Sequence, residues 1–247
     1  MVTAAAQDQW RLLDVQGHDT RLGQIEHRSR TLPEHAEVDR LQAMLSRIGD
    51  ELVLARAEAG DVARQLAKAE SDVEQVRQRA ARDQSRLDSG QGTAKDLQAL
   101  QHELVTLAQR QSVLEDAELE VMERQEATDA RVQQIEAEQQ RVQVELAGVT
   151  ARRDDRLAEL VTEATEVGRA REQSAAGVPA ELIALYERIR SNAGGVGAAR
   201  LHQRRCDGCR LELNNTDLSN LRAAAENSVI RCEECGRILI RTPDSGL

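Results

Sequence analysis

The four cysteines of this 247-residue chain form two pairs near its C-terminus, and both pairs have the spacing Cys-x-x-Cys. The pairs are Cys206 with Cys209 and Cys232 with Cys235. A tetrahedral Zn²⁺ site needs four thiolates that converge on one point, and one Cys-x-x-Cys turn supplies two of them. The 22 residues between the pairs leave room for a small sheet. The spacing therefore predicts one zinc ion with these four cysteines as its ligands.

Redox chemistry and disulfide bonds are the alternatives to zinc at these cysteines. A redox Cys-x-x-Cys motif is expected once, close to a βαβ pattern, whereas this sequence has two motifs and no parallel-strand segments around them. Disulfide bonds need an oxidising compartment, and residues 1–7 lack the basic and apolar regions of a secretion signal. Because four cysteines fill a tetrahedral shell, no position is left for a substrate, and we expect the zinc to be structural.

Two glycines accompany the cysteine pairs. Gly208 lies inside the first pair, and Gly236 directly follows the second. We expect positive φ at both positions, because zinc-binding turns need it and glycine tolerates it better than other residues.

The rest of the chain has the composition of long helices and not of a large globular core. It contains no Phe, one Trp and one Tyr, and 31% of its residues are charged. Ala, Leu, Glu, Gln and Arg dominate, as they do in helices that are buried along one seam. No apolar run approaches the roughly 18 residues of a membrane span. We therefore expect a cytoplasmic protein with no membrane segment.

Heptad repeats occupy most of the first 150 residues. From Leu41 to Leu87 the apolar residues recur in steps of four and three, with Asp83 as the polar exception. A second seam runs from Leu97 to Val149, and we place Ala117 in it. Repeats of this period predict helices that pair as a coiled coil.

Residues 88–93 separate the two seams and contain two glycines. Thr93 can cap the next helix, with Asp96 at its third position. A turn here folds the chain into an antiparallel hairpin whose seams face each other. The predicted register pairs Leu41 with Val142, Ile48 with Ile135, and Leu52 with Val132.

The hairpin is predicted to extend over residues 1–175, with its tip near 88–93 and a kink near Pro33. Proline fits best at the first position of the helix that follows. Before it, we expect Leu12 and Val15 to pack on the second arm, near residues 157–167.

Residues 176–199 are predicted to form a linker, with a short helix from Pro179 to Arg190 and a hinge rich in glycine. The hinge contains Gly194, Gly195 and Gly197, and we expect it to be flexible. Residues 200–242 then form the zinc ribbon, with short strands and one helix near 217–225. The fold class is thus mainly α, a long antiparallel coiled-coil helical hairpin with a small C-terminal four-cysteine zinc ribbon.

Three segments near the C-terminus resemble the bacterial C4-type zinc-ribbon coiled-coil hairpin family. They are the helix Leu185-Tyr186-Glu187-Arg188-Ile189, the glycine segment from Gly194 to Ala198, and the second cysteine pair within Ile230–Leu239. The resemblance implies that Cys206, Cys209, Cys232 and Cys235 bind zinc and that the protein is a scaffold or adaptor and not an enzyme. Some relatives are tied to transcriptional regulation through an alternative sigma factor, to flagellar or secretion-system assembly, and to nucleic-acid binding.

Arginines surround both cysteine pairs and form a candidate face for nucleic acid or for a partner protein. This face consists of Arg204, Arg205, Arg210, Arg237 and Arg241. Residues 196–247 carry eight arginines and seven acidic residues, so the net charge of −10 arises from residues 1–195. An acidic stalk repels nucleic acid, and a phosphate-binding surface is therefore expected only on the ribbon. Ordinary solvation, or support of the negatively charged zinc–thiolate centre, is the alternative use of these arginines.

Two main hypotheses of function follow. The first is a zinc-ribbon adaptor that binds a protein partner through the coiled coil and the ribbon. The second is a nucleic-acid-binding or transcription-associated regulator that uses the arginine face. A thiol oxidoreductase ranks third, because it rests only on the Cys-x-x-Cys spacing. The sequence has no Ser-His-Asp set, phosphate loop or dinucleotide motif, so we expect neither catalysis nor a small-molecule substrate.

Overall fold

The computed structural model describes residues 2–247. Its helices are α1 (Ala6–Arg30), α2 (Pro33–Asp88), α3 (Ala94–Ala176), α4 (Ala180–Asn192), α5 (Asn215–Ala223) and the 3₁₀ helix η1 (Pro243–Ser245). Its strands are β1 (Ala198–His202), β2 (Arg205–Cys206), β3 (Ile230–Arg231) and β4 (Ile238–Ile240). The predicted fold class, a mainly α coiled-coil hairpin with a small cysteine-containing ribbon, is confirmed.

The chain divides into two compact units. The hairpin unit is Ala36–Thr150, and the ribbon unit consists of the residues up to His35 together with Ala151–Leu247. The predicted division into residues 1–175, 176–199 and 200–242 stays a prediction. Within residues 2–247, no helix is both long enough and apolar enough to cross a membrane.

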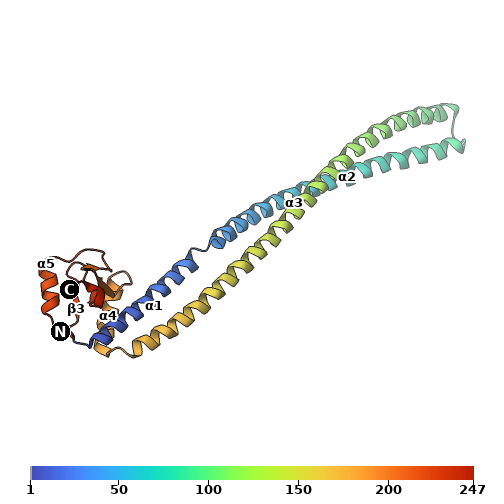
Figure 1. Ribbon diagram of the computed structural model, residues 1–247. Helices are drawn as coiled ribbons and strands as arrows, with labels where there is room; N and C mark the ends of the chain where they lie inside the picture. The colour runs from blue at the N-terminus through green and yellow to red at the C-terminus, as the bar shows by residue number, and fades with distance from the viewer. Residues whose placement is uncertain (1) are drawn as a thin grey trace. The chain divides into compact units, whose positions relative to one another are not determined.

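In the hairpin unit, α2 and α3 run side by side and bury their heptad seams against each other (Figure 1). One buried cluster contains Leu41, Ile48, Val142 and Val149, with Ile135 packed against it. Two of the predicted facing pairs, Leu41 with Val142 and Ile48 with Ile135, thus share one cluster. Apolar burial along such a seam stabilises the paired helices far more than helix propensity does.

The second seam differs from the prediction at one place. Glu118 is half-buried and Ala117 is exposed, so the heptad continues through the charged residue. The steps Leu114–Glu118–Val121 keep the alternation of four and three that the packing requires. Period therefore outweighs side-chain type at this position.

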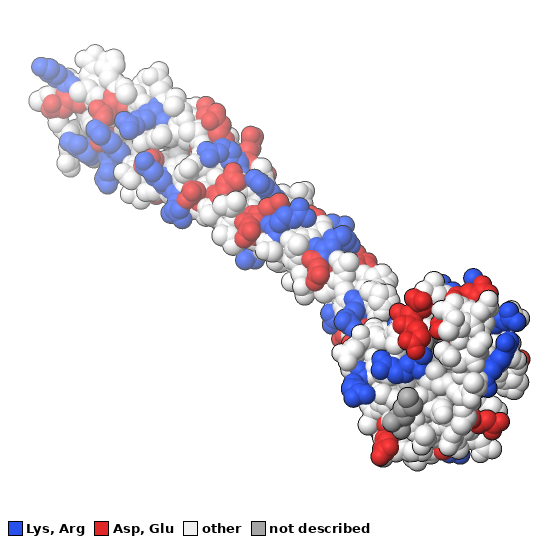
Figure 2. Space-filling view, turned by 90° about the vertical axis from the view of Figure 1, so that its left-hand side faces the viewer, with Lys and Arg blue, Asp and Glu red and all other residues white. Residues whose placement is uncertain are grey.

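On the face of the hairpin that Figure 2 shows, basic and acidic side chains are interspersed along its length. Ion pairs join α2 to α3 along the hairpin unit: Arg40–Glu145, Arg56–Glu136, Glu58–Arg131, Arg77–Glu115 and Arg79–Glu103. Exposed pairs of this kind contribute little stability, but opposite charges across the seam favour this pairing over others.

The tip of the hairpin lies between Asp88 and Ala94. Gly90 and Gly92 have positive φ and turn the chain. The Thr93 backbone N–H donates to Asp96 Oδ2 at 2.9 Å, and the Asp96 N–H donates to Thr93 Oγ1 at 3.3 Å. The predicted cap at Thr93 is confirmed. Hydrogen bonds from Thr93 hold the pKa of the Asp96 carboxyl below its ordinary value.

The core of the ribbon unit is a small four-stranded sheet with the order β2-β1-β4-β3. Strands β1 and β4 are parallel, which contradicts the expectation of no parallel strands around the cysteines, and the other pairs are antiparallel. One face of the sheet packs on α1 and α4, where the buried residues are Leu12, Val15, Leu182, Tyr186, Ile189, Ala198, Ile238 and Ile240. The other face packs on α5 and the cysteines, where the buried residues are Ala199, Leu201, Cys206, Leu213, Leu218, Leu221, Cys232 and Leu239.

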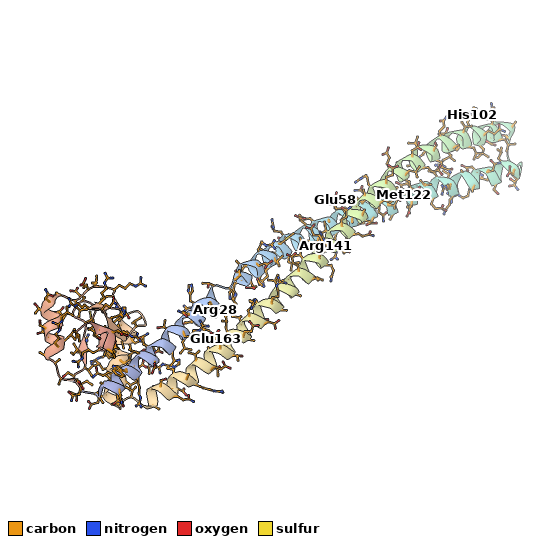
Figure 3. All side chains as sticks on the ribbon, viewed as in Figure 1. Arg28, Glu58, His102, Met122, Arg141 and Glu163 are labelled. Atoms are coloured by element: carbon orange, nitrogen blue, oxygen red, sulfur yellow. The ribbon has the colours of Figure 1, made fainter. Side chains whose placement is uncertain are left out.

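Helix α1 therefore belongs to the core of the ribbon and does not only extend the coiled coil. Leu12 and Val15 are fully buried and lie in one cluster with residues of α4 and β4. Ala175 of α3 also packs against this cluster, and the expected contact of Leu12 and Val15 with residues 157–167 stays a prediction. Further along α1, Arg28 does point toward α3, where it pairs with Glu163 at 3.2 Å (Figure 3).

A buried polar network joins α1, α3 and α4 beneath the sheet. Asp19, whose side chain is 2% exposed, accepts hydrogen bonds from Arg171 Nε at 2.7 Å and from the Tyr186 hydroxyl at 2.7 Å. Arg190 also pairs with Asp19, at 3.5 Å. Burial and the bond to Asp19 raise the pKa of Tyr186, and the bond to Asp19 raises the pKa of Arg171. The buried Asp19 carboxylate thus has two guanidinium groups and one hydroxyl as partners.

Candidate metal centre

The two cysteine pairs sit in matching turns at the ends of short strands. Cys206 ends β2, and Cys232 directly follows β3. In the first turn the Arg210 N–H donates to the Cys206 carbonyl at 2.7 Å, and in the second the Gly236 N–H donates to the Cys232 carbonyl at 2.8 Å. The same backbone bond closes both turns, so both present their two thiols in the same way.

The four sulfur atoms lie close enough together to share one metal ion. All four Sγ atoms are within 4.8 Å of one another, and the Cys206–Cys235 and Cys209–Cys232 distances are both 3.9 Å. A zinc ion with Zn–S bonds of about 2.3 Å and tetrahedral geometry places its sulfurs about 3.8 Å apart. None of the four cysteines forms a disulfide in residues 2–247. The donor set and its spacing fit Zn²⁺.

Burial makes two of the four thiols poor acids when no metal is bound. Cys206 and Cys232 are buried, and burial raises the pKa of the Cys206 thiol to about 12 and also raises the pKa of Cys232. A zinc ion supplies the positive charge that the buried thiolates lack, and its binding releases their protons. The site is therefore built to be filled by a cation.

The turn glycines follow the expectation only in part. Gly236 has φ +70°, as predicted, but the matching position in the first turn is Arg210, with φ +64°. Gly208 does not have positive φ; a Cβ there would lie 2.7 Å from Cδ of Arg237. Space, and not backbone conformation, therefore requires glycine at 208. Arg210 holds a left-handed conformation that is unfavourable for any residue with a side chain.

The left-handed position in each turn gives a testable prediction. Replacing Arg210 by glycine should strengthen apparent zinc affinity about 2–5-fold, because the relief of strain exceeds the added chain entropy. Gly236→Ala should weaken it about 5–30-fold, since it adds the same strain to the second turn. Competition with a chromophoric chelator measures both. Arg222→Gly, in the last turn of α5, is the control and should destabilise that helix. If Arg222→Gly strengthened zinc affinity as much as Arg210→Gly does, the strain argument would be contradicted.

Two of the five arginines of the predicted face donate hydrogen bonds to backbone carbonyls of the ribbon unit. Arg237 donates to the carbonyls of Ala193 at 2.7 Å, Val196 at 3.1 Å and Gly208 at 3.3 Å. Arg241 donates to carbonyls in the segment from the end of α5 to β3, at Leu221, Ala224, Ala225, Glu226 and Ser228. These contacts hold loops in place, and no sequence pattern indicated them.

The other three arginines are exposed and lie around the β1–β2 hairpin and the first cysteine turn. Arg204 occupies the tight turn of this hairpin with φ +64° and donates to the Gly246 carbonyl at 3.3 Å. Arg205 is on β2, and Arg210 follows Cys209. The structure thus leaves Arg204, Arg205 and Arg210 exposed, whereas Arg237 and Arg241 donate to backbone carbonyls of the ribbon unit.

The segment between α4 and β1 is held by side chains from two directions. The Gln16 side chain accepts from the Gly197 N–H at 2.7 Å and donates to the Gly195 carbonyl at 3.1 Å. No side chain fits at Gly197, where a Cβ would lie 2.7 Å from Tyr186. The predicted glycine hinge therefore has specific partners on α1, and Arg237 holds its other side.

Comparison with known proteins identifies both parts of the chain. The profile of the CT398-like coiled coil hairpin domain matches residues 15–194, and the profile of the C4-type zinc ribbon domain matches residues 205–239. The second match and the four clustered sulfurs together confirm one structural Zn²⁺. The two profiles describe a coiled coil and a zinc ribbon, and neither is a known enzyme family.

Similar proteins extend over nearly the whole chain. Uncharacterized protein Rv2229c of Mycobacterium tuberculosis is 39% identical over 96% of this chain and 97% of its own length. A solved structure from Mycobacterium smegmatis is 35% identical, covers 98% of this chain and 100% of its own, and has a TM-score of 0.86. The structure of CT398 from Chlamydia trachomatis, 16% identical over 96% of this chain and 98% of its own, has a TM-score of 0.65 and shares the fold.

Proposed function

Since this chain belongs to the family of CT398-like coiled-coil hairpin proteins, we propose that it is a non-enzymatic adaptor that binds a protein partner. In this proposal Cys206, Cys209, Cys232 and Cys235 are the ligands of the one zinc ion. The hairpin provides a long helical surface, and the ribbon provides a compact recognition head. The adaptor works in the cytoplasm, where thiols stay reduced and available to the metal.

The closed donor set supports a structural and not a catalytic zinc. Four sulfur atoms within 4.8 Å of one another fill a tetrahedral shell, so substrate has no open position on the metal. A catalytic zinc needs such a position to polarise a substrate or to activate water. The zinc in this proposal therefore maintains the shape of the recognition head.

The observation that favours a protein partner over nucleic acid is the commitment of Arg237 and Arg241 to backbone carbonyls. Their charge is directed into the ribbon unit, and three exposed arginines remain of the predicted face. Each phosphate contact adds to nucleic-acid affinity, so a face of three arginines binds weakly near physiological salt. The acidic net charge of the chain opposes polyanions further.

Nucleic-acid binding through Arg204, Arg205 and Arg210 is the second candidate function. It is favoured by the exposure of these three side chains around the β1–β2 hairpin and the first cysteine turn. Phosphate binding at this face would make affinity fall steeply with salt, whereas a protein interface depends less on ionic strength.

Charge reversal at this face separates the two functions. The zinc-loaded chain is immobilised and exposed to native lysate, and each protein that it retains is identified, purified and tested for direct binding. In a parallel experiment, single-stranded RNA is titrated against the chain at several salt concentrations. We expect Arg204→Glu with Arg205→Glu to leave stoichiometric protein binding unchanged. Arg82→Glu with Arg110→Glu, the same charge change on the hairpin, is the control. Tight, strongly salt-dependent RNA binding that only the first double variant abolishes, with no direct protein partner, would reverse the ranking.

A further inference from the structure

Arg237 links both cysteine turns to the segment between α4 and β1. Its guanidinium donates to Gly208 in the first turn and to Ala193 and Val196 in the segment. Its own backbone belongs to the second turn, where its carbonyl accepts the Cys232 N–H at 2.9 Å. Three parts of the ribbon unit thus meet at one residue.

Zinc is what brings the two cysteine turns together at this residue. Each turn supplies two thiolates, and the metal fixes the distance between the turns. The side chain of Arg237 fits against the first turn only because residue 208 is glycine, since a Cβ there would lie 2.7 Å from Arg237 Cδ. The position of the guanidinium therefore depends on the approach of the two turns.

The same segment is held on its other side by α1. Gln16 binds the Gly195 carbonyl and the Gly197 N–H, and its Oε1 also accepts from the Tyr186 hydroxyl at 3.1 Å. Through Tyr186 this contact continues to the buried Asp19. Residues 193–197 thus lie between the metal centre on one side and the buried polar network of α1, α3 and α4 on the other.

We propose that Arg237 couples zinc occupancy to the order of residues 193–197, so that loss of zinc releases the ribbon sheet from α4. When the cysteine turns separate, the guanidinium loses its place beside Gly208 and withdraws from Ala193 and Val196. The segment is then held by Gln16 and by the Gly195 N–H, which donates to the Arg190 carbonyl at 3.0 Å. The biological role of this coupling rests on the proposed adaptor function. In that function, the ribbon sheet keeps a fixed orientation on α4 only while the recognition head holds zinc.

Hydrogen exchange of the peptide that spans residues 193–198 tests the coupling, because the Gly197 N–H donates to Gln16 at 2.7 Å and the Gly195 N–H donates to the Arg190 carbonyl at 3.0 Å. In the zinc-loaded protein, Arg237→Gln should make this peptide exchange at least about tenfold faster, since it removes charged donors to two of its carbonyls. Arg231→Gln is the matched control: Arg231 also lies beside the second turn, but its Nε donates to the Gly236 carbonyl within that turn. It should leave the exchange of 193–198 unchanged.

Zinc removal separates coupling from simple loss of a contact. A chelator should accelerate exchange of 193–198 by a larger factor in the wild type than in Arg237→Gln, because in the variant the link is already broken before zinc is removed. Equal acceleration by the chelator in both proteins would overturn the proposal, as would unchanged exchange in zinc-loaded Arg237→Gln. If Arg237→Gln retains no zinc, Arg237→Lys, which keeps the charge and one donor group, replaces it in the same comparison.

Linkage provides an independent measurement, since two coupled sites affect each other by the same factor. Gln16→Met loosens the segment from the α1 side and should weaken zinc affinity several-fold in the wild type but not in Arg237→Gln. Gln24→Met, an exposed position on α1, is the control. Equal weakening by Gln16→Met in both backgrounds would contradict the coupling. None of these experiments includes a partner, so their failure would leave the adaptor function standing, and failure to bind a protein would leave the coupling standing.

Discussion

Removal of zinc by a chelator is expected to unfold residues 198–241 and to leave the helices of the hairpin unit intact. The ribbon sheet has short strands, two of only two residues, and structural zinc sites contribute about 10–16 kcal/mol of binding energy in zinc-finger peptides. The seam of α2 and α3 contains no cysteine and buries its own apolar residues. Limited proteolysis should cut within 198–241, while most of the helical circular dichroism persists.

Cys232→Ser should have the same effect as the chelator, because three thiolates hold zinc much less tightly than four. Readdition of zinc should restore protease resistance in the wild type and not in the variant. Cys232 lies at 2% exposure in the centre of the site, so no solvent molecule easily replaces its sulfur. Loss of the helical signal together with zinc would show that the hairpin unit depends on the ribbon, contrary to this expectation.

Asp19→Ala is expected to destabilise the ribbon unit by about 3–5 kcal/mol, the cost of breaking a buried ion pair. The substitution leaves Arg171, Arg190 and the Tyr186 hydroxyl without their common acceptor. Urea unfolding measures this loss. Trp10, the single tryptophan, reports on the ribbon unit, because its Nε1 donates to the Arg241 carbonyl at 2.7 Å.

Asp14→Ala is the matched control, since Asp14 lies on the same helix and is exposed. It should change the free energy of unfolding by less than about 0.5 kcal/mol. Asp19→Asn, which keeps acceptors but loses the charge, should fall between the two. Equal effects of Asp14→Ala and Asp19→Ala on the Trp10 transition would disprove a stabilising role for the network.

The heptad period predicted the hairpin because apolar residues at a fixed spacing specify both the helix and its buried face. The prediction failed at Ala117, because we placed this apolar residue in the seam. The strict period places Glu118 there. A half-buried glutamate is tolerated there because neighbouring seam positions supply the apolar contact. The period is thus a better guide than residue type in a long coiled coil.

The cysteine cluster was predictable because both turns encode their geometry within four residues. The arginines were not, since the acceptors of Arg237 lie up to 44 residues away in sequence and are backbone carbonyls. Backbone acceptors leave no trace in the sequence of the segment that provides them. The close approach at Gly208 is hidden in the same way, because a glycine needed for space looks like one needed for a turn.

The place of α1 in the ribbon core was also beyond prediction from the sequence. Leu12 and Val15 have the spacing of a coiled-coil seam, and the same spacing suits packing on a sheet and a helix. Tyr186 is fully buried in this core, although we expected its helix to belong to a linker. Nothing in the sequence identified Gln16 and Asp19 as partners of its hydroxyl.

The packing of α1 against β4 sets the order in which the chain can finish folding during synthesis. Translation produces Leu12 and Val15 long before Ile238 and Ile240, which complete their cluster. Closing a loop of that length is costly in chain entropy, and pairing of the hairpin arms beforehand shortens the free chain within it. A ribosome that stalls before residue 238 therefore displays α1 with part of its apolar face uncovered, and proteases and chaperones recognise exposed apolar surface of this kind.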